Sequence, residues 1–507
     1  MRGHRHATDA QQQQLEQEID RLRRELAERD RQLAEAQKTI ADTQKTLGEA
    51  KKKIADLERQ LALRQQNSTT TSKPPSSDGL AGCQRLRGRR TKSRRKPGGQ
   101  AGHPGHQRAL VPPERVNRFV AHYPDTCGRC QRPLPARERR VGGEPRRHQV
   151  TEVPRIEADV TEHDCYGVEC ACGHVTYATL PEEVASGFGP QLAALIAYLT
   201  VVCRLSRQSV RRLLEGLLDI SLSVGSTQHA WEEASAAVAP AYRELEEALP
   251  RQPGLNVDET SHRTKGAKRW LWVLAGPTFV FFHISPSRGA GVLRRLLGEQ
   301  FRGVLCSDRL QTYLAYAATS RQFCWAHGIR NLLSALELAK TAAGKRFCTE
   351  ALALTRRFFR LWHRYRGDRE ARGAPLTRAQ LIRRVRPLAK RLFALADQHR
   401  DSADTDVRNL ARAFMKHHEW FFTFVTKKGV DPTNNVAERS LRHAVLWRKT
   451  SFGTRSVAGE FAVSRLLTIT QTCQLQQLNV LAYLTAAIRC HRRRQAVASL
   501  LPKRATK

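Results

Sequence analysis

Apolar residues recur every seven positions through the first sixty residues, and this repeat restricts the fold of the chain more than any other feature. The unbroken seam consists of Ile19, Leu26, Leu33, Ile40, Leu47, Ile54 and Leu61. A companion seam, interrupted by Arg29 and Thr43, consists of Leu15, Leu22, Ala36, Ala50 and Leu57. Sustained heptads predict a left-handed coiled coil. A stripe this narrow in so polar a helix favours self-association through residues 1–66 over a lone amphipathic helix.

The composition changes abruptly after this repeat, first to NSTTTSKPPSSDG and then to a basic tract. Eight of the twelve residues from Arg85 to Lys96 are Arg or Lys, among them Arg87, Arg89 and Arg90. Such a tract suits phosphate backbones or a minor groove, although a solvated linker is the simpler alternative. We expect residues 67–118 to form a disordered basic linker. A leucine-zipper transcription factor is excluded, because there the basic region precedes the zipper.

The charge of the whole chain also indicates a nucleic-acid partner. It carries 86 Lys and Arg against 48 Asp and Glu, a formal net charge of +38. A field of this sign attracts polyanions, and neutralised phosphates release condensed counterions. A ribosome-like or simply Arg-rich protein is the alternative. With 507 residues, of which 40% are hydrophobic, the chain can fold into about three or four domains.

No run of residues resembles a membrane span or the apolar core of a signal peptide, so we expect a cytoplasmic protein without a membrane partner. In a reducing compartment, cysteines are better interpreted as metal ligands or buried thiols than as disulfides. Cys127 and Cys130 form a C-x-x-C pair, and Cys170 and Cys172 a tighter C-x-C pair. Two such pairs predict a structural zinc-binding module over residues 119–182, in which Cys165 or His174 could replace one ligand. Six single cysteines are expected in the core: Cys203, Cys306, Cys324, Cys348, Cys473 and Cys490.

Residues 183–250 carry apolar side chains at helical spacing. We predict one helical run from Pro190 to Ile220, and a further helix from Ser226, which is a candidate cap, to Ala239. The pair could form a helix-turn-helix-like unit with Arg211 and Arg212 facing outward, although such helices more often simply pack. We expect a helical DNA-binding region here.

The segment 251–334 alternates between strand and helix patterns. GLNVDET, RWLWVLAG and TFVFFHI predict three strands, followed by a helix in GAGVLRRLLGEQF, a strand in GVLCSD, a helix through Tyr313 and a strand in RQFCWAH. Asp258 lies on the first strand and Asp308 ends the fourth. This order is that of an α/β ribonuclease H-like core, which is an argument about fold and not yet about function.

A third acid is expected on a helix after the sheet. In DPTNNVAERSLRHAVLWRK, Asn434 or Asn435 can cap a helix whose first turns contain Glu438. Residues 430–470 would complete the core, residues 335–429 would form a helical insertion, and residues 471–507 a helical basic tail. The whole is a multidomain chain.

Three converging carboxylates suit phosphodiester chemistry. Two Mg²⁺ ions about 3.5–4 Å apart can activate the attacking oxygen and stabilise the leaving oxygen. Mg²⁺, or Mn²⁺ in its place, prefers carboxylate oxygens and water. Each acid alone has a structural explanation, since Asp258 could end a strand, Asp308 could cap a helix and Glu438 could pair with Arg442. Together, in strand, strand and helix settings on so basic a chain, they favour a catalytic site for two metal ions.

These residues resemble the DDE transposases of the insertion sequence 66 family. SKPPSSDG and RKPGGQAGHPGH look like the family's linker, and CGRC with ECACG is similar to its zinc module. NVDET, CSDRLQTY, FCWAHGIR, NNVAERSLR and RKTSFGTRS are similar to its catalytic blocks and occur in the same order. In two places the chain departs from the pattern: Asp431 is separated from Asn434 by two residues, and the second cysteine pair lacks one intervening residue.

The resemblance implies that Asp258, Asp308 and Glu438 are the catalytic triad. It also implies a DNA-facing set consisting of His327, Arg330, Arg439, Arg442, Arg448 and Lys449. Accessory proteins of the element are further implied partners, and the expected location is the bacterial cytoplasm, at the nucleoid.

The sequence therefore predicts a transposase that cuts the ends of its element and joins them to target DNA. The alternatives are a catalytically silent DNA-binding remnant and a nuclease with the same core. The presence of all three acids disfavours the first, and the zipper and zinc module disfavour the second.

Overall fold

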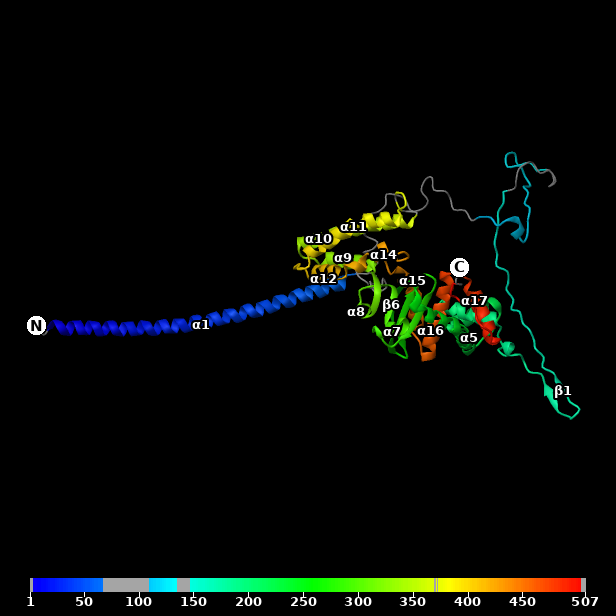
Figure 1. Cartoon of the computed structure of the whole chain (residues 1–507), viewed down its shortest axis with the longest axis horizontal. Coiled ribbons are helices and arrows are strands. Elements are labelled where there is room, and N and C mark those ends of the chain that lie inside the picture. Colours follow the sequence, from blue (N-terminus) through cyan, green and yellow to red (C-terminus); the bar gives the residue numbers. More distant parts are fainter. Residues whose placement is uncertain (1–2, 67–108, 135–145, 369–370, 372, 503–507) are drawn as a thin grey trace.

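A computed structural model describes residues 3–66, 109–134, 146–368, 371 and 373–502 of the chain. It has several parts: a long N-terminal helix, an extended arm, and a mixed α/β body with its own helical extension (Figure 1). The basic residues Arg87, Arg89 and Arg90 lie outside the described residues. None of the described helices combines the length and apolar character required to cross a bilayer.

Helix α1, Gly3–Gln65, confirms the helix predicted from the heptads and projects from the body as a rod (Figure 1). The described side chains of both seams, listed above, are exposed, with Ile19 at 41% and Leu15 at 68% as the extremes. Only the C-terminal end touches the body, where Arg59 pairs with Asp406 at 2.8 Å and Glu58 with Lys340 at 3.2 Å. The seams therefore remain open, and the coiled coil itself stays a prediction.

The arm that follows contains little regular structure. Its elements are η2 (Pro113–Arg115), β1 (Gly167–Glu169), β2 (Val175–Tyr177) and η3 (Glu182–Val184). Strands β1 and β2 form a short antiparallel hairpin, and the side chains of both are exposed. The described part of the arm thus has no apolar core of its own.

Before the strands of the central sheet, the chain forms a group of helices. The group consists of α3 (Pro190–Val201), α4 (Arg207–Leu218), α5 (Val224–Ala237), α6 (Ala239–Ala248) and η4 (Leu249–Arg251). Two details of the prediction were wrong. The run expected from Pro190 to Ile220 breaks into α3 and α4, because Ser206 caps a new helix by accepting a hydrogen bond from Ser209 N. Helix α5 is capped by Ser223 and not by Ser226, which instead donates its backbone N–H to that cap.

The central sheet has the strand order β5-β4-β3-β6-β7. Its elements are β3 (Gly254–Thr264), β4 (Ala267–Ala275), β5 (Val280–Ser285), α7 (Gly291–Leu297), β6 (Gln300–Ser307), α8 (Gln311–Leu314) and β7 (Ala317–Phe323). Strands β3, β4 and β5 are antiparallel, whereas β6 and β7 run parallel to β3. The succession of elements predicted from the sequence is confirmed.

One strand boundary differs from the prediction. The strand expected over residues 321–327 ends at Phe323, and α9 (Trp325–Leu338) begins two residues later. The backbone N–H of Trp325 binds the carbonyl of Pro432 instead of extending the sheet. Cys324 is therefore the helix cap and His327 lies in the first turn of a helix.

Helices after the insertion cover the sheet. They are α15 (Asn435–Ser451), α16 (Val457–Leu475) and α17 (Val480–Arg492). Helix α15 packs on β3 and β4, while α16 covers the edge strand β5. On α16, the hydroxyls of Ser464, Thr468 and Thr472 accept hydrogen bonds from backbone N–H groups of β5. Their spacing of four residues matches one helix face and satisfies donors that an edge strand would otherwise expose.

The insertion is helical, as predicted, and has a second apolar core. It contains α10 (Ala342–Arg366), α11 (Arg378–Gln398), α12 (Thr405–Lys416), α13 (His418–Phe421) and α14 (Thr423–Thr426). Aromatic rings from distant segments meet in this core, where Trp325 contacts Phe358, Phe414 and Phe421. Val304 and Phe323 of the sheet join the same core, so the insertion is packed against β6 and β7.

The single cysteines follow the prediction with one exception. Cys306, Cys324, Cys348 and Cys473 are buried and Cys490 is half-buried. Cys203 is exposed, because it lies in the turn between α3 and α4 and not within the apolar face of a helix.

Candidate active site

The pairing of β3 with β6 places two of the predicted acids next to each other. Leu255 aligns with Leu305 and Asn256 with Cys306. Two residues later, Asp258 lies on β3 and Asp308 lies directly after the end of β6, at the same edge of the sheet. Neighbouring strands lie about 4.8 Å apart. Asp258 accepts a hydrogen bond from Glu259 N and Asp308 one from Leu310 N, both at 2.9 Å.

The third acid reaches the sheet through a loop that is anchored before α15 begins. Asn434 donates its side-chain N–H to Val257 O at 2.8 Å and its backbone N–H to Cys324 Sγ at 3.1 Å. Asn434 is the N-cap of α15, but its side chain makes no capping bond, because it binds β3 instead. Glu438 follows in the first turn of α15. The acid is thereby positioned above the strand that carries Asp258.

Asp258 lies within electrostatic reach of Asp308 and Glu438. Among the described residues, however, the three acids do not form a group whose ligand oxygens all lie within 4.8 Å of one another. Burial raises the pKa of Asp258 to about 8, and the nearby charges of Glu259, Asp308 and Glu438 contribute. Burial also raises the pKa of Asp308, although Leu310 N–H and three arginines, Arg288, Arg309 and Arg330, partly offset it. A buried carboxylate among other carboxylates is destabilised in its charged form unless a cation is present.

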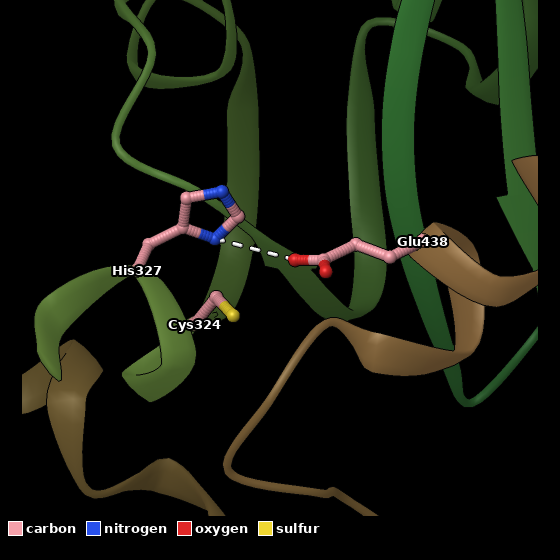
Figure 2. Close-up of side chains that lie close together, drawn as sticks. All are labelled: Cys324, His327 and Glu438. Carbon is pink, nitrogen blue, oxygen red and sulfur yellow. Dashed lines mark ion pairs between the residues drawn. The ribbon is translucent and has the colours of Figure 1, made fainter. Parts of the chain in front are cut away.

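The Glu438 carboxylate also faces α9 (Figure 2). Its Oε1 lies 3.2 Å from an Arg330 nitrogen and 3.5 Å from His327 Nδ1. Burial, together with the charge of Arg330, lowers the pKa of His327 to about 4, so the ring is neutral at pH 7. Among the described residues, Cys324, His327 and Glu438 are the group of three whose candidate ligand atoms all lie within 4.8 Å of one another.

Several oxygen groups at this edge of the sheet fit a hard divalent cation. Asn256, which lies on the same face of β3 as Asp258, has a buried side-chain oxygen without a hydrogen-bond partner. Asp258 is half-buried, and no basic group is among the causes of its pKa shift. Carboxylate and amide oxygens are the donors that Mg²⁺ prefers. The donor set is therefore compatible with Mg²⁺ or Mn²⁺.

Sequence reasoning missed a second group of residues beside the acids. Glu259 is almost completely buried, pairs with Arg288 at 2.7 Å and accepts a hydrogen bond from the Tyr313 hydroxyl. Glu259 lies in the motif NVDET and Tyr313 in CSDRLQTY, so the motifs already contained the two residues that make this contact. Sequence reasoning also took Cys324 only for a core residue, whereas it accepts the Asn434 N–H beside the site.

The predicted DNA-facing residues divide into two sets. Arg439, Arg442 and Lys449 are exposed along α15. Arg448 is half-buried and donates to Thr260 Oγ1 at 3.1 Å and to Ser261 Oγ at 3.1 Å. The six residues are therefore not one continuous surface, since His327, Arg330 and Arg448 make contacts within the protein.

The cysteine pairs predicted to bind zinc are both exposed or nearly so. Hydrogen bonds from Cys130 lower the pKa of the Cys127 thiol, and those from Cys172 lower the pKa of the Cys170 thiol. Each pair is thus preorganised toward the thiolate that zinc requires. In the described part of the chain the two pairs do not come together in one group of ligands. The zinc site stays a prediction.

Comparison with known proteins gives two family matches and several relatives. A model described as "Transposase IS66 family" matches residues 185–461, more than half of the chain. A model described as "Family of unknown function (DUF6444)" matches residues 6–109. Curated relatives from Sinorhizobium fredii (strain NBRC 101917 / NGR234) include "Uncharacterized protein y4hP", 26% identical over 67% of this chain, and "Uncharacterized protein y4jD", 25% identical over 52%. The alignments span 65% and 54% of those two relatives.

Proposed function

The chain belongs to the transposase IS66 family, and from this premise we propose that it cuts the ends of a mobile element and joins them to target DNA. Asp258, Asp308 and Glu438 are the proposed catalytic residues and ligands of two Mg²⁺ or Mn²⁺ ions. The observation that carries the proposal is the parallel pairing of β3 with β6. It brings Asp258 on β3 and Asp308 directly after β6 to the same edge of the sheet, where the charge of Glu438 also acts on Asp258.

We also assign the sheet to the ribonuclease H-like fold. Three antiparallel strands, two parallel strands at one side and a following acid-bearing helix support this assignment. DNA is the partner that the family implies. The basic composition of the chain supports the same partner, because phosphate neutralisation dominates affinity for DNA.

When bound, the metal ions would supply an activated oxygen nucleophile and a stabilised leaving oxygen. The chain's own residues would hold the metal ions and orient the carboxylates. Asp258 presents its carboxylate from β3 and Asp308 from the residue directly after β6, and Arg330 with neutral His327 holds the Glu438 carboxylate. Arg309, close to Asp308, is placed to balance the negative charge of the reacting phosphate.

Two further assignments follow from the N-terminal regions. We propose that α1 pairs with a second copy of the chain, because its exposed seams carry apolar residues at coiled-coil spacing. Removal of residues 1–66 would then lower the mass measured in solution by light scattering to that of one chain. We propose that the four cysteines Cys127, Cys130, Cys170 and Cys172 bind structural zinc, which metal analysis of Cys→Ser variants tests.

A strand-transfer assay tests the proposed activity. It combines the protein, a divalent metal, the element's end sequences and a supercoiled target. Asp308→Asn should remove joined products while leaving binding of the ends nearly intact. Asp219→Asn is the matched control, because Asp219 is exposed and has a left-handed φ of 54° that Asn also adopts readily.

The outcomes separate the proposal from its rivals. Joining that requires metal and is lost only in Asp308→Asn supports a transposase. Cutting without joining would favour a nuclease with the same core. Undiminished joining by Asp308→Asn would contradict the assigned site.

A further inference from the structure

A second site is formed at the other end of β3 and α15. A pocket of about 480 Å³ lies between the helices α3, α4 and α5, the end of β3, the last turns of α15 and the loop that leads into α16. This volume falls within the range of about 300–1,000 Å³ typical of ligand sites. The three acids of the candidate active site do not line it.

The lining of this pocket is strongly basic. Four arginines contribute, Arg204, Arg207, Arg448 and Arg455, and no Asp or Glu is among the lining residues. Arg207 lies over the ring of Trp231 with 4.5 Å between its guanidinium carbon and the ring centroid. Arg455 is exposed at the rim. Glu232 near Arg207 and Glu460 near His262 lie outside the lining, and the charge of the lining itself is positive, which favours an anionic ligand.

Two buried polar atoms in the lining have no partner within the protein. Trp231 and His262 are each only 4% exposed, yet Trp231 Nε1 and His262 Nδ1 make no hydrogen bond. The indole N–H can only donate. A buried donor without an acceptor destabilises the folded state, so such atoms in a native protein require an explanation. An acceptor that enters the pocket from outside would provide one.

The N-terminus of α16 adds to this environment. Ser456 caps this helix of 19 residues, and both Ser456 and Gly459 line the pocket. Backbone N–H groups at a helix N-terminus bind anions well, phosphate groups included. Basic side chains, unpartnered buried groups and a helix N-terminus therefore converge on one cavity.

The distance from the acids can be derived from the elements that join the two sites. His262 follows Asp258 by four residues on the same face of β3, which corresponds to about 13 Å. Arg448 follows Glu438 by ten residues on α15, about 15 Å. Phosphates of one DNA strand advance by about 3.4 Å along the helix axis. The pocket is thus a few nucleotides from the acids.

We propose that this pocket binds a phosphate group of a DNA strand a few nucleotides from the reacting phosphate. Arg207, Arg455 and the Trp231 N–H are its proposed donors. The inference rests on the proposed function, because that function supplies the DNA. An anchor at this distance would fix the register of the strand over the acids, since phosphate contacts position DNA without reading its sequence.

The test measures the affinity for a fluorescein-labelled duplex of arbitrary sequence, by anisotropy, without divalent metal and over a series of NaCl concentrations. Arg455→Gln should weaken binding about tenfold and reduce the slope of log affinity against log salt by about 1. Arg302→Gln is the matched control, because Arg302 is exposed on β6, far along the chain from the pocket lining. It should leave the slope nearly unchanged.

Trp231→Phe separates binding from folding. It removes a donor that has no partner in the free protein, so the unfolding temperature should stay nearly constant while affinity falls several-fold. Unchanged affinity with a lowered unfolding temperature would show a purely structural role and overturn the proposal. Inorganic phosphate should displace the duplex more effectively than chloride at equal ionic strength, and it should lose this advantage in Arg455→Gln. Displacement by phosphate no stronger than by chloride would overturn the proposal as well.

These results are distinguishable from failure of the proposed function, because no chemistry occurs in the binding assay. If the unaltered protein joins DNA but Arg455→Gln and Trp231→Phe bind like it, the pocket assignment is wrong and the function stands. If both variants lose affinity while the unaltered protein joins no DNA, the anchor stands and the function is wrong.

Discussion

The two ends of the β3–α15 pair differ in the charge of their side chains: one end carries carboxylates and the other carries arginines. At one end, Asp258 and Asp308 stand beside each other with Glu438 nearby, and burial raises the pKa of both aspartates. At the other end, four arginines surround a pocket whose buried Trp231 and His262 lack partners. One strand and one helix thus connect the proposed cation site with the proposed anion site.

This difference shows how one packed strand–helix pair can separate two tasks on DNA: reaction at one phosphate and binding of another. Chemistry on a phosphate needs cations that neutralise charge where bonds change. Positioning needs fixed donors a few nucleotides away. Because β3 and α15 are packed against each other, the spacing between the two tasks is set by the fold and not by a mobile loop.

The largest expected effect is on the rate of strand transfer, which should depend on the acidic end and not on the basic end. Glu438→Gln should lower the rate of strand transfer by about 10⁴-fold or more, as for other residues that act as one catalytic unit. Affinity for DNA should remain or rise slightly, because a negative charge is removed. Arg455→Gln should do the reverse, lowering affinity while most of the rate at saturating DNA remains.

Glu299→Gln provides the control for this comparison. The Glu299 side chain is 90% exposed and only loosely paired with Arg294, at 3.8 Å. Both rate and affinity should match the unaltered protein. If Glu438→Gln lost affinity and rate in parallel, the acidic end would be a binding site and the contrast between the ends would disappear.

The second effect is a dependence of stability on pH in the metal-free protein. The folded pKa of Asp258 is about 8, against an ordinary value of 3.8, so the folded state holds the proton that the unfolded state releases. The free energy of unfolding should therefore be highest below pH 4 for this group and fall as the pH rises to about 8. The loss is of order 5 kcal/mol.

Denaturant unfolding in EDTA at several pH values measures this dependence. Asp258→Asn should flatten the curve and be more stable than the unaltered protein at pH 8. Added Mg²⁺ should stabilise the unaltered protein and leave the variant nearly unchanged. A curve of equal slope in both proteins would mean that Asp258 is not the group that titrates.

A smaller effect concerns the link that positions Glu438. Cys324→Ala would leave the buried backbone N–H of Asn434 without its acceptor, which should cost about 1–3 kcal/mol of stability. It should also slow strand transfer, because α15 is anchored there. Cys324→Ser keeps an acceptor and should lose less of both, as thermal unfolding and the joining rate can show. Equal losses in the two variants would argue against the hydrogen bond.

The smallest effect on DNA affinity is expected at the contact between α15 and β3 beside the pocket. Arg448 lines the pocket and donates to Thr260 Oγ1 and Ser261 Oγ. Arg448→Lys keeps the charge but loses the forked geometry, so affinity for DNA should fall about fivefold, the equivalent of one hydrogen bond. Thr260→Val, which removes one acceptor from the same contact, is the companion variant. Full affinity in both would show that the contact does not organise the pocket.

Much of the core could be predicted because its signals are local. The order of strands and helices from Gly254 to Phe323 follows from alternation and turns, and the heptads of α1 specify a helix directly. The three acids could be proposed because they stand in separate short motifs in strand, strand and helix settings. Their electrostatic coupling, by contrast, depends on burial that no local pattern contains.

The features that escaped prediction depend on contacts between distant residues. The strand before α9 ended early because Trp325 N binds Pro432 O, more than a hundred residues later. The Asn434 side chain binds Val257 O on β3 and makes no capping hydrogen bond to α15. The basic pocket joins segments from Thr200 to Leu467, so its composition becomes visible only in the folded chain.

A change of metal preference tests the central claim most directly. Asp308→Cys replaces a hard oxygen ligand by a thiolate, which Mg²⁺ binds poorly and the softer Mn²⁺ accepts more readily. Strand transfer by this variant should be absent in Mg²⁺ and partly restored in Mn²⁺, whereas the unaltered protein should work in both. Undiminished joining by Asp308→Cys in Mg²⁺ would show that Asp308 holds no catalytic metal and would contradict the account.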